Sequence, residues 1–126
     1  MYFTALSDGT NTYTFSHGLI PTANTTTLNV NNSVTIQYTH GTNSGKFLGV
    51  SRDNAGGQST VDLGVTVAVN TVYVLTICFS KARNEARFYV NGVYAGRVTG
   101  SMPNAAATGD RTIIVKSAGA TQRNVY

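Results

Sequence analysis

Short runs of β-branched and aromatic residues, separated by Gly, Asn, Ser and Thr, extend along the whole chain. No window keeps the i, i+3, i+4, i+7 spacing of apolar positions that marks an amphipathic helix, so we predict no substantial helix. Turn signals recur about every 8–12 residues, which is typical of a sandwich or barrel rather than of βαβ units. We therefore predict an all-β fold, a two-sheet antiparallel β-sandwich. The expected strands are residues 27–30, 33–39, 46–52, 58–63, 72–80, 87–90, 93–98 and 111–116.

Two of these strand pairs carry hairpin signals. Asn91-Gly92 between residues 87–90 and 93–98 is the strongest short turn signal, because both residues accept a positive φ. Asn31-Asn32 predicts a second hairpin between residues 27–30 and 33–39.

The run at residues 72–80 is almost continuously apolar or β-branched, which predicts a central strand covered on both faces. Cys78 lies within it, and a small buried thiol is the expected state of such a cysteine.

Composition fits one domain with a polar but weakly charged surface. The 126 residues are 41% hydrophobic and only 11% charged, against about 25% charged in a typical domain. Cys78 is the only cysteine, which excludes an internal disulfide and a CxxC metal site. The first residues contain no basic stretch and no long apolar run, so we expect neither a signal peptide nor insertion into a membrane.

The formal charge of +4 comes from nine basic and five acidic residues. A nucleic-acid interface requires clustered Lys and Arg, but the basic residues are scattered singly along the sequence, so we predict no nucleic-acid partner. They are Lys46, Arg52, Lys81, Arg83, Arg87, Arg97, Arg111, Lys116 and Arg123.

Residues 71–77, a polar turn and residues 86–93 (ARFYVNGV) together resemble the laminin G-like and concanavalin A-like lectin/glucanase superfamily. In that superfamily a strand, a turn and a hairpin of this type recur in the same order. Residues 44–50, 59–65 and 114–119 resemble the versions found in bacteriophage virion proteins. The likeness covers most of the chain, and its motifs are structural rather than chemical. It implies a concanavalin A-like jelly roll on a virion or an extracellular surface.

The same resemblance implies that terminal strands are missing. Such domains usually begin with a further strand and end in one that this chain enters only at Asn124-Val125-Tyr126. We therefore expect a fragment of a longer protein with an open sheet edge. Because open edges pair with a second copy, we predict a homo-oligomer.

The acidic residues argue against an enzyme. Retaining glucanases of the superfamily need two carboxylates about 5–5.5 Å apart, typically on one strand. The acids here are isolated, lie mostly in predicted turns, and never share a strand at i, i+2 spacing. They are Asp8, Asp53, Asp62, Glu85 and Asp110.

Metal ligands are equally sparse. His17 and His40 have no Cys or carboxylate at ligand spacing, which argues against zinc. Asp53 with Asn54, or Asp110, could each give an oxygen to calcium, but calcium needs 6–8 oxygens. We expect no cofactor, with calcium as the less favoured alternative.

Carbohydrate binding remains as the leading function. Aromatic side chains and planar polar groups hold such ligands, and Tyr38, Tyr73, Tyr89 and Tyr94 lie in predicted strands. The chain contains no Trp, which weakens the case, and each Tyr alone is better explained by packing with its hydroxyl at the rim. By alternation, Arg87, Tyr89 and Asn91 share one face of their strand. The candidate carbohydrate-binding residues are Tyr38, His40, Arg87, Tyr89 and Asn91.

We therefore predict a non-catalytic module for carbohydrate binding or surface recognition. A purely structural virion domain without a ligand is the alternative, and a glycan-active enzyme is the least favoured reading. An outward cluster of Tyr, Arg and Asn would separate the first from the second.

Overall fold

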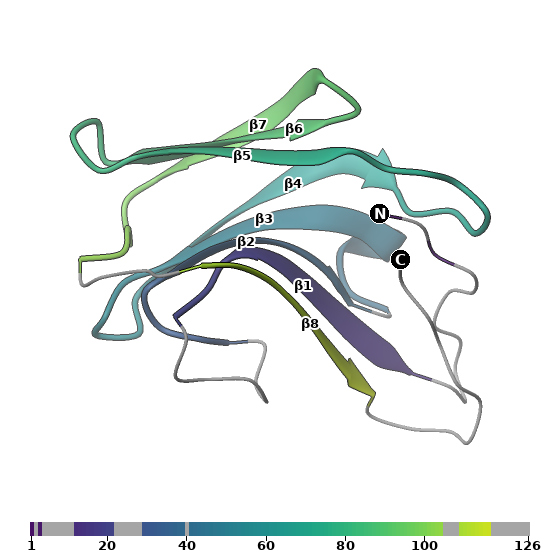
Figure 1. Ribbon diagram of the computed structural model, residues 1–126, viewed down its shortest axis with the longest axis horizontal. Helices are drawn as coiled ribbons and strands as arrows, with labels where there is room; N and C mark the ends of the chain where they lie inside the picture. The colour runs from purple at the N-terminus through teal and green to yellow at the C-terminus, as the bar shows by residue number, and fades with distance from the viewer. Residues whose placement is uncertain (2, 4–11, 22–28, 40, 105–108, 117–126) are drawn as a thin grey trace.

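Two antiparallel sheets packed face to face make up the computed structural model (Figure 1). It describes residues 1, 3, 12–21, 29–39, 41–104 and 109–116. The five-stranded sheet contains β1 (Tyr13–Leu19), β2 (Ser33–Thr39), β3 (Lys46–Arg52), β4 (Gln58–Thr66) and β8 (Asp110–Lys116). The three-stranded sheet contains β5 (Leu75–Ser80), β6 (Glu85–Val90) and β7 (Val93–Thr99). The strand orders are β4-β3-β2-β1-β8 and β5-β6-β7, which confirms the predicted all-β sandwich.

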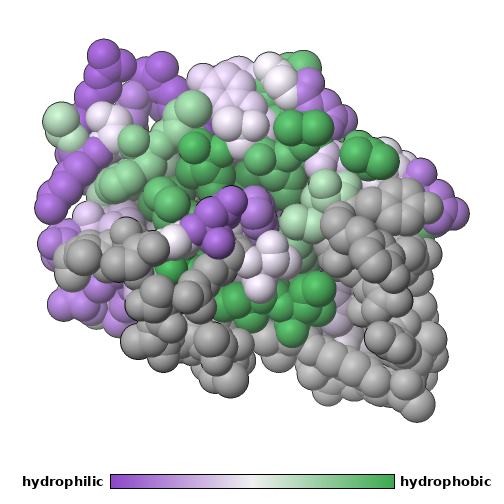
Figure 2. Space-filling model, in the orientation of Figure 1, coloured by the Kyte–Doolittle hydropathy of each residue, from purple (hydrophilic) through white to green (hydrophobic). Residues whose placement is uncertain are grey.

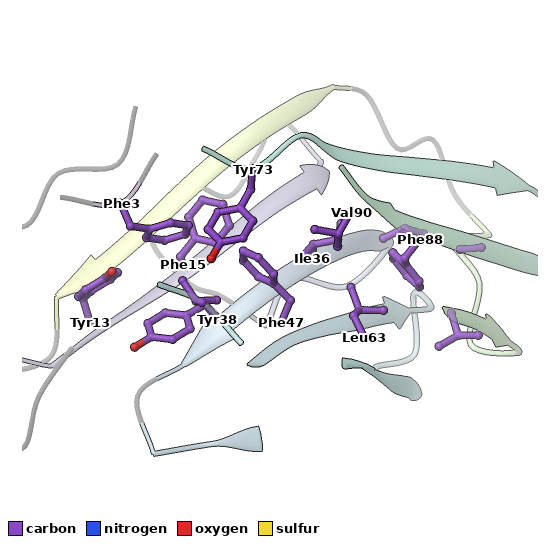
Figure 3. Close-up of a cluster of buried hydrophobic side chains, with 14 of the residues drawn as sticks. Phe3, Tyr13, Phe15, Ile36, Tyr38, Phe47, Leu63, Tyr73, Phe88 and Val90 are labelled. Atoms are coloured by element: carbon purple, nitrogen blue, oxygen red, sulfur yellow. The ribbon is translucent and has the colours of Figure 1, made fainter. Parts of the chain in front are cut away.

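A large aromatic cluster fills the space between the sheets (Figure 3). Phe3 lies at its centre, with its ring centroid 5.4 Å from that of Phe15 and 6.1 Å from that of Phe47. The start of the chain is fixed there by backbone hydrogen bonds, because the amide of Tyr73 donates to the carbonyl of Met1 and the amide of Asn70 to that of Phe3. These bonds dock the N-terminal residues against the segment that leads into β5.

The two sheets come into close contact where a glycine of one faces a phenylalanine of the other. A Cβ atom at Gly49 on β3 would lie only 2.6 Å from the ring of Phe88 on β6. Phe88 is fully buried, so this contact leaves room for no larger residue than glycine at position 49. β7 covers β4 and β3, and β5 covers β2 and also approaches β1, where a Cβ atom at Gly18 would lie 2.6 Å from Cδ1 of Ile77.

Most predicted strands are confirmed, including both strands of the Asn-Gly hairpin, but the first predicted hairpin is wrong. Asn29 and Val30 lie outside any strand, and residues 22–28 are outside the described part of the chain. β2 pairs with β1 and β3 instead. Asn32 does adopt a positive φ of 56°, but its amide donates to the carbonyl of Asp53 in the β3–β4 turn. Strand β1 was not predicted, although Tyr13 and Phe15 alternate with Thr14 and Ser16.

The expectation of a central strand at residues 72–80 is also wrong. β5 begins at Leu75 and is the outermost strand of its sheet. Leu75, Ile77 and Phe79 pack against the core, whereas Thr76 and Cys78 are exposed. The buried thiol predicted for Cys78 is therefore corrected to an exposed one.

Candidate functional site

The outer face of the three-stranded sheet carries the most distinctive group of exposed side chains. On β6, Phe88 and Val90 are buried against the core, so Arg87 and Tyr89 point outward, as strand alternation predicts. Tyr89 lies opposite Tyr94 of β7, and Arg87 lies opposite Arg97 of the same strand. Two tyrosines and two arginines therefore form neighbouring cross-strand pairs.

A bulge in β7 is what brings these pairs together. Tyr94 and Arg97 are three positions apart, so in a regular strand their side chains would point to opposite faces. The ladder shifts between Phe88, which faces Gly96, and Tyr89, which faces Tyr94. The extra residue is Ala95, and one inserted residue restores a common face for Tyr94 and Arg97.

The four side chains line a surface hollow of about 260 Å³. The rings of Tyr89 and Tyr94 meet edge to face, with centroids 5.7 Å apart and an interplanar angle of 72°. Tyr94 is exposed and Tyr89 half-buried, so the pair presents aromatic surface and phenolic hydroxyls to solvent. Arg87 and Arg97 supply the charged wall of the same hollow.

Glu85 lies close to three arginines and holds Arg87 in place. Its side chain is only 9% exposed, and its Oε1 lies 2.8 Å from Nη2 of Arg87. Nη1 of Arg97 is 3.7 Å from Oε2, and Nη1 of Arg83 is 4.0 Å from Oε1. Arg87 and Glu85 also line a second hollow of about 150 Å³, next to the first, with Cys78, Phe79, Ser80 and Arg83. Three guanidinium groups thus surround one carboxylate, so the basic residues are not all dispersed as the sequence predicted.

Two of the other predicted site residues, Tyr38 and Asn91, lie elsewhere. Tyr38 is only 3% exposed and packs in the aromatic core between Tyr13 and Phe3, so it cannot form a surface with Tyr89 (Figure 3). His40 is outside the described residues. Asn91 occupies the β6–β7 turn, where its Oδ1 accepts a hydrogen bond from the amide of Val74 at 2.8 Å. Of the four candidates in the described part of the chain, only Arg87 and Tyr89 line the hollow.

A second region of interest is a cavity of about 270 Å³ at the open side between the sheets. It is lined by His17, Gly18, Leu19, Leu75, Thr76, Ile77 and Asp110. Nδ1 of His17 is 2.9 Å from Oγ1 of Thr112, and its Nε2 is 3.5 Å from Oδ1 of Asp110. Both ring nitrogens are therefore engaged by side chains of β8, and the imidazole links two neighbouring strands.

The remaining described carboxylates also serve the fold. Asp53 accepts a hydrogen bond from the amide of Gly57, and Asp62 pairs with Lys46. Oδ1 of Asn54 accepts from Nδ2 of Asn32, so this oxygen already has a donor. Within the described ranges, no group of three or more His, Cys, Asp and Glu residues could hold a metal ion. No helix in this part of the chain is long and apolar enough to cross a membrane.

Comparison with known proteins adds no relative. No protein-family model, curated protein or solved structure matches the chain. The resemblance to the concanavalin A-like superfamily therefore rests on the sequence motifs alone, while the sandwich architecture stands on the structure itself.

Proposed function

We propose that this domain is a non-catalytic carbohydrate-recognition module of a virion or cell surface, and that it binds its saccharide on the outer face of β6 and β7. The supporting observation is the hollow lined by Tyr89, Tyr94, Arg87 and Arg97. A sugar ring has an apolar C–H face that packs on an aromatic ring, and hydroxyls that accept hydrogen bonds from guanidinium groups. The four side chains supply both kinds of contact within one concave site.

The setting of the carboxylates favours binding over cleavage. Glycoside hydrolysis needs one carboxyl group as acid and another as base or nucleophile, both facing the sugar. Glu85 is paired with arginines and nearly buried, and Asp53, Asp62 and Asp110 are engaged in turns or in cross-strand contacts. The hollow itself is lined by no acidic residue among those described.

The test is a glycan-array screen of the purified domain, run with calcium and again with EDTA. We expect binding to a related set of saccharides that EDTA leaves unchanged. Tyr89→Ala should weaken saccharide binding about tenfold, because aromatic packing contributes about 1.4 kcal/mol to the free energy of binding. Val69→Ala, an exposed residue outside the hollow, is the matched control. Absence of binding to every saccharide, or binding that survives Tyr89→Ala, would contradict the proposal.

A structural assembly domain is the second candidate, and a different observation favours it. Val72 and Val74 are exposed in the segment that leads into β5, one of the two edge strands of its sheet. An exposed apolar strand at a sheet edge is a template for pairing with another chain. The two roles are separable, because neither valine lines the hollow.

A further inference from the structure

The charges around the hollow are unbalanced. Arg83, Arg87 and Arg97 bring three positive charges to one face, and Glu85 is the one carboxylate within 4.0 Å of them among the described residues. Arginines do not lose their proton at any physiological pH. The site therefore keeps an excess of positive charge.

The single carboxylate lies on the far side of Arg87 from the hollow. Glu85 lines the neighbouring hollow, whereas the aromatic hollow is lined by Arg87, Tyr89, Tyr94 and Arg97. The short contact with Glu85 fixes the guanidinium of Arg87 and so makes it a rigid wall of the site. A ligand in the hollow would meet two guanidinium groups and, among the described residues that line it, no acidic side chain.

Most donors of these arginines are left for a ligand. Each guanidinium carries five N–H donors, while a carboxylate offers two oxygens. The 2.8 Å contact of Arg87 with Glu85 is a close ion pair, whereas the 3.7 Å contact of Arg97 and the 4.0 Å contact of Arg83 are too long for hydrogen bonds. Arg97 is 59% exposed, so its guanidinium group can turn toward a ligand in the hollow.

We infer that the saccharide is acidic, and that Arg97 and Arg87 bind its carboxylate or sulfate group while the sugar ring packs on Tyr89 and Tyr94. The inference rests on the proposed function and names the class of sugar. An arginine fork matches the paired oxygens of a carboxylate or a sulfate and forms two parallel charge-assisted hydrogen bonds. Uronic acid units and sulfated units present this group beside a ring with a C–H face.

The surface fits a short acidic saccharide better than a nucleic acid. Nucleic-acid binding along a chain needs a basic groove that follows the backbone over several phosphates. Lys46 and Arg52 belong to the five-stranded sheet, where they pair with Asp62 and Gln58. Among the described side chains, the remaining positive charges are the three arginines and Lys81 in the β5–β6 turn, all on the smaller sheet, so they form a local patch rather than a track.

The experiment measures affinity by calorimetry for four probes at one fixed ionic strength. The probes are a tetragalacturonate, a sulfated galactose tetramer, a neutral galactose tetramer and a single-stranded oligonucleotide of similar charge. We expect at least one acidic tetramer to bind about tenfold more tightly than the neutral one, as a charge-assisted hydrogen bond predicts. Comparing the affinities of the uronate and the sulfated tetramer shows which anionic group the arginines prefer.

Three variants test whether Arg97 causes the preference for acidic over neutral tetramers. Arg97→Gln should bring the ratio of acidic to neutral affinity down to about one, and Arg97→Lys should restore only part of it, since lysine cannot form the fork. Arg52→Gln removes the same charge from the other sheet and should leave the ratio unchanged. Circular dichroism checks that each variant folds, which is expected because Arg97 is an exposed residue.

The outcomes separate this inference from the proposed function. Equal affinity for acidic and neutral tetramers, with loss in Tyr89→Ala, would overturn the acidic preference and leave carbohydrate recognition standing. Absence of binding to all three tetramers would overturn both. Tighter binding of the oligonucleotide than of either acidic tetramer would also overturn the inference, because the patch would then select phosphate chains rather than acidic sugars.

Discussion

Asp62 on β4 has the most clearly defined electrostatic setting of any carboxylate in the described structure. Its Oδ1 accepts a hydrogen bond from the amide of Gly64 at 2.7 Å, and its Oδ2 lies 3.2 Å from Nζ of Lys46. The backbone amide of Gly64 is the largest cause that holds the pKa of Asp62 below its ordinary value of 3.8, and Lys46 and Asn43 lower this pKa further. Partial desolvation acts in the opposite direction.

We predict that Asp62 titrates below 3.8 in the folded protein and that Lys46→Met raises this pKa without bringing it to 3.8. The reason is that the Gly64 amide remains when the lysine charge is removed. Because the folded pKa is lowered, ionised Asp62 stabilises the fold above the unfolded pKa, and this contribution disappears as pH falls through the folded pKa. Carboxyl ¹³C NMR titration, with the urea-unfolded protein as reference, measures both values. A folded midpoint at or above the unfolded one would contradict the prediction.

At single positions, strand alternation was sufficient to predict half of the candidate site. Arg87 and Tyr89 face outward because Phe88 and Val90 must face the core. Tyr94 and Arg97 could not be assigned in this way, since their odd spacing requires the bulge at Ala95, which no local sequence signal marked. The role of Glu85 depended on three arginines from separate positions, and only the folded sheet brings them within 4.0 Å.

At the scale of elements, the β6–β7 hairpin is the unit whose local chemistry matches its structure most directly. Asn91 and Gly92 adopt positive φ values of 53° and 78°, as an Asn-Gly turn requires. Asn91 also connects the hairpin to the start of β5: its amide donates to the carbonyl of Val74, and its Oδ1 accepts from the amide of Val74. The turn therefore orders all three strands of the smaller sheet.

A series of substitutions at Asn91 should separate the stabilising effect of its positive-φ conformation from that of its side-chain hydrogen bond. Asn91→Ala imposes a left-handed conformation on alanine and removes the side-chain hydrogen bond, so we expect a loss of about 2 kcal/mol in the free energy of unfolding. Asn91→Gly keeps the conformation and loses only the bond, at about 1 kcal/mol. Asn91→Asp keeps the acceptor and should remain close to wild type. Urea unfolding measures all three, and equal losses for Ala and Asp would show that the acceptor has no effect.

Elements with a clear local signal were predictable, and the errors came from tertiary context. β3, β6 and β7 follow from alternation and from turn residues. β5 was misread because a run of β-branched residues looks the same whether a second layer covers it or an edge leaves it open. The Asn31-Asn32 pair failed as a hairpin signal because Asn32 bonds across space to the β3–β4 turn rather than to a local partner strand.

At the scale of the whole molecule, the two sheets differ in width, and this leaves one side of the sandwich open. β5 has a ladder partner on one side only, β6, within the described structure. The cavity of about 270 Å³ lies between β5 and β1, with Leu75 and Ile77 in its wall. Figure 2 shows hydrophobic residues across the middle of this side, along the course that β5 takes in Figure 1. The sequence predicted an open edge for another reason, the absence of terminal strands, and residues 117–126 lie outside the described part of the chain.

We predict that two copies associate by pairing their β5 edges. Val74→Lys should weaken this association, because a lysine at a strand edge opposes pairing with another strand. Val93→Lys is the matched control, since Val93 is 69% exposed against 59% for Val74 but lies on β7, the opposite edge strand of the same sheet. Sedimentation equilibrium over a range of concentrations measures both. A wild-type monomer at the highest concentration, or equal weakening by Val93→Lys, would contradict the prediction.

Edge pairing would also affect recognition of an immobilised glycan. An antiparallel β5–β5 contact across a two-fold axis perpendicular to the sheet joins two three-stranded sheets into one of six strands. The outer faces of both copies, each with its Tyr89–Tyr94 hollow, then point in the same direction. Two sites on one face bind a glycan-covered surface with a higher avidity than either site alone. Val74→Lys should therefore lose binding to a dense glycan surface while keeping the affinity for a free saccharide, which would tie the two candidate functions to one assembly.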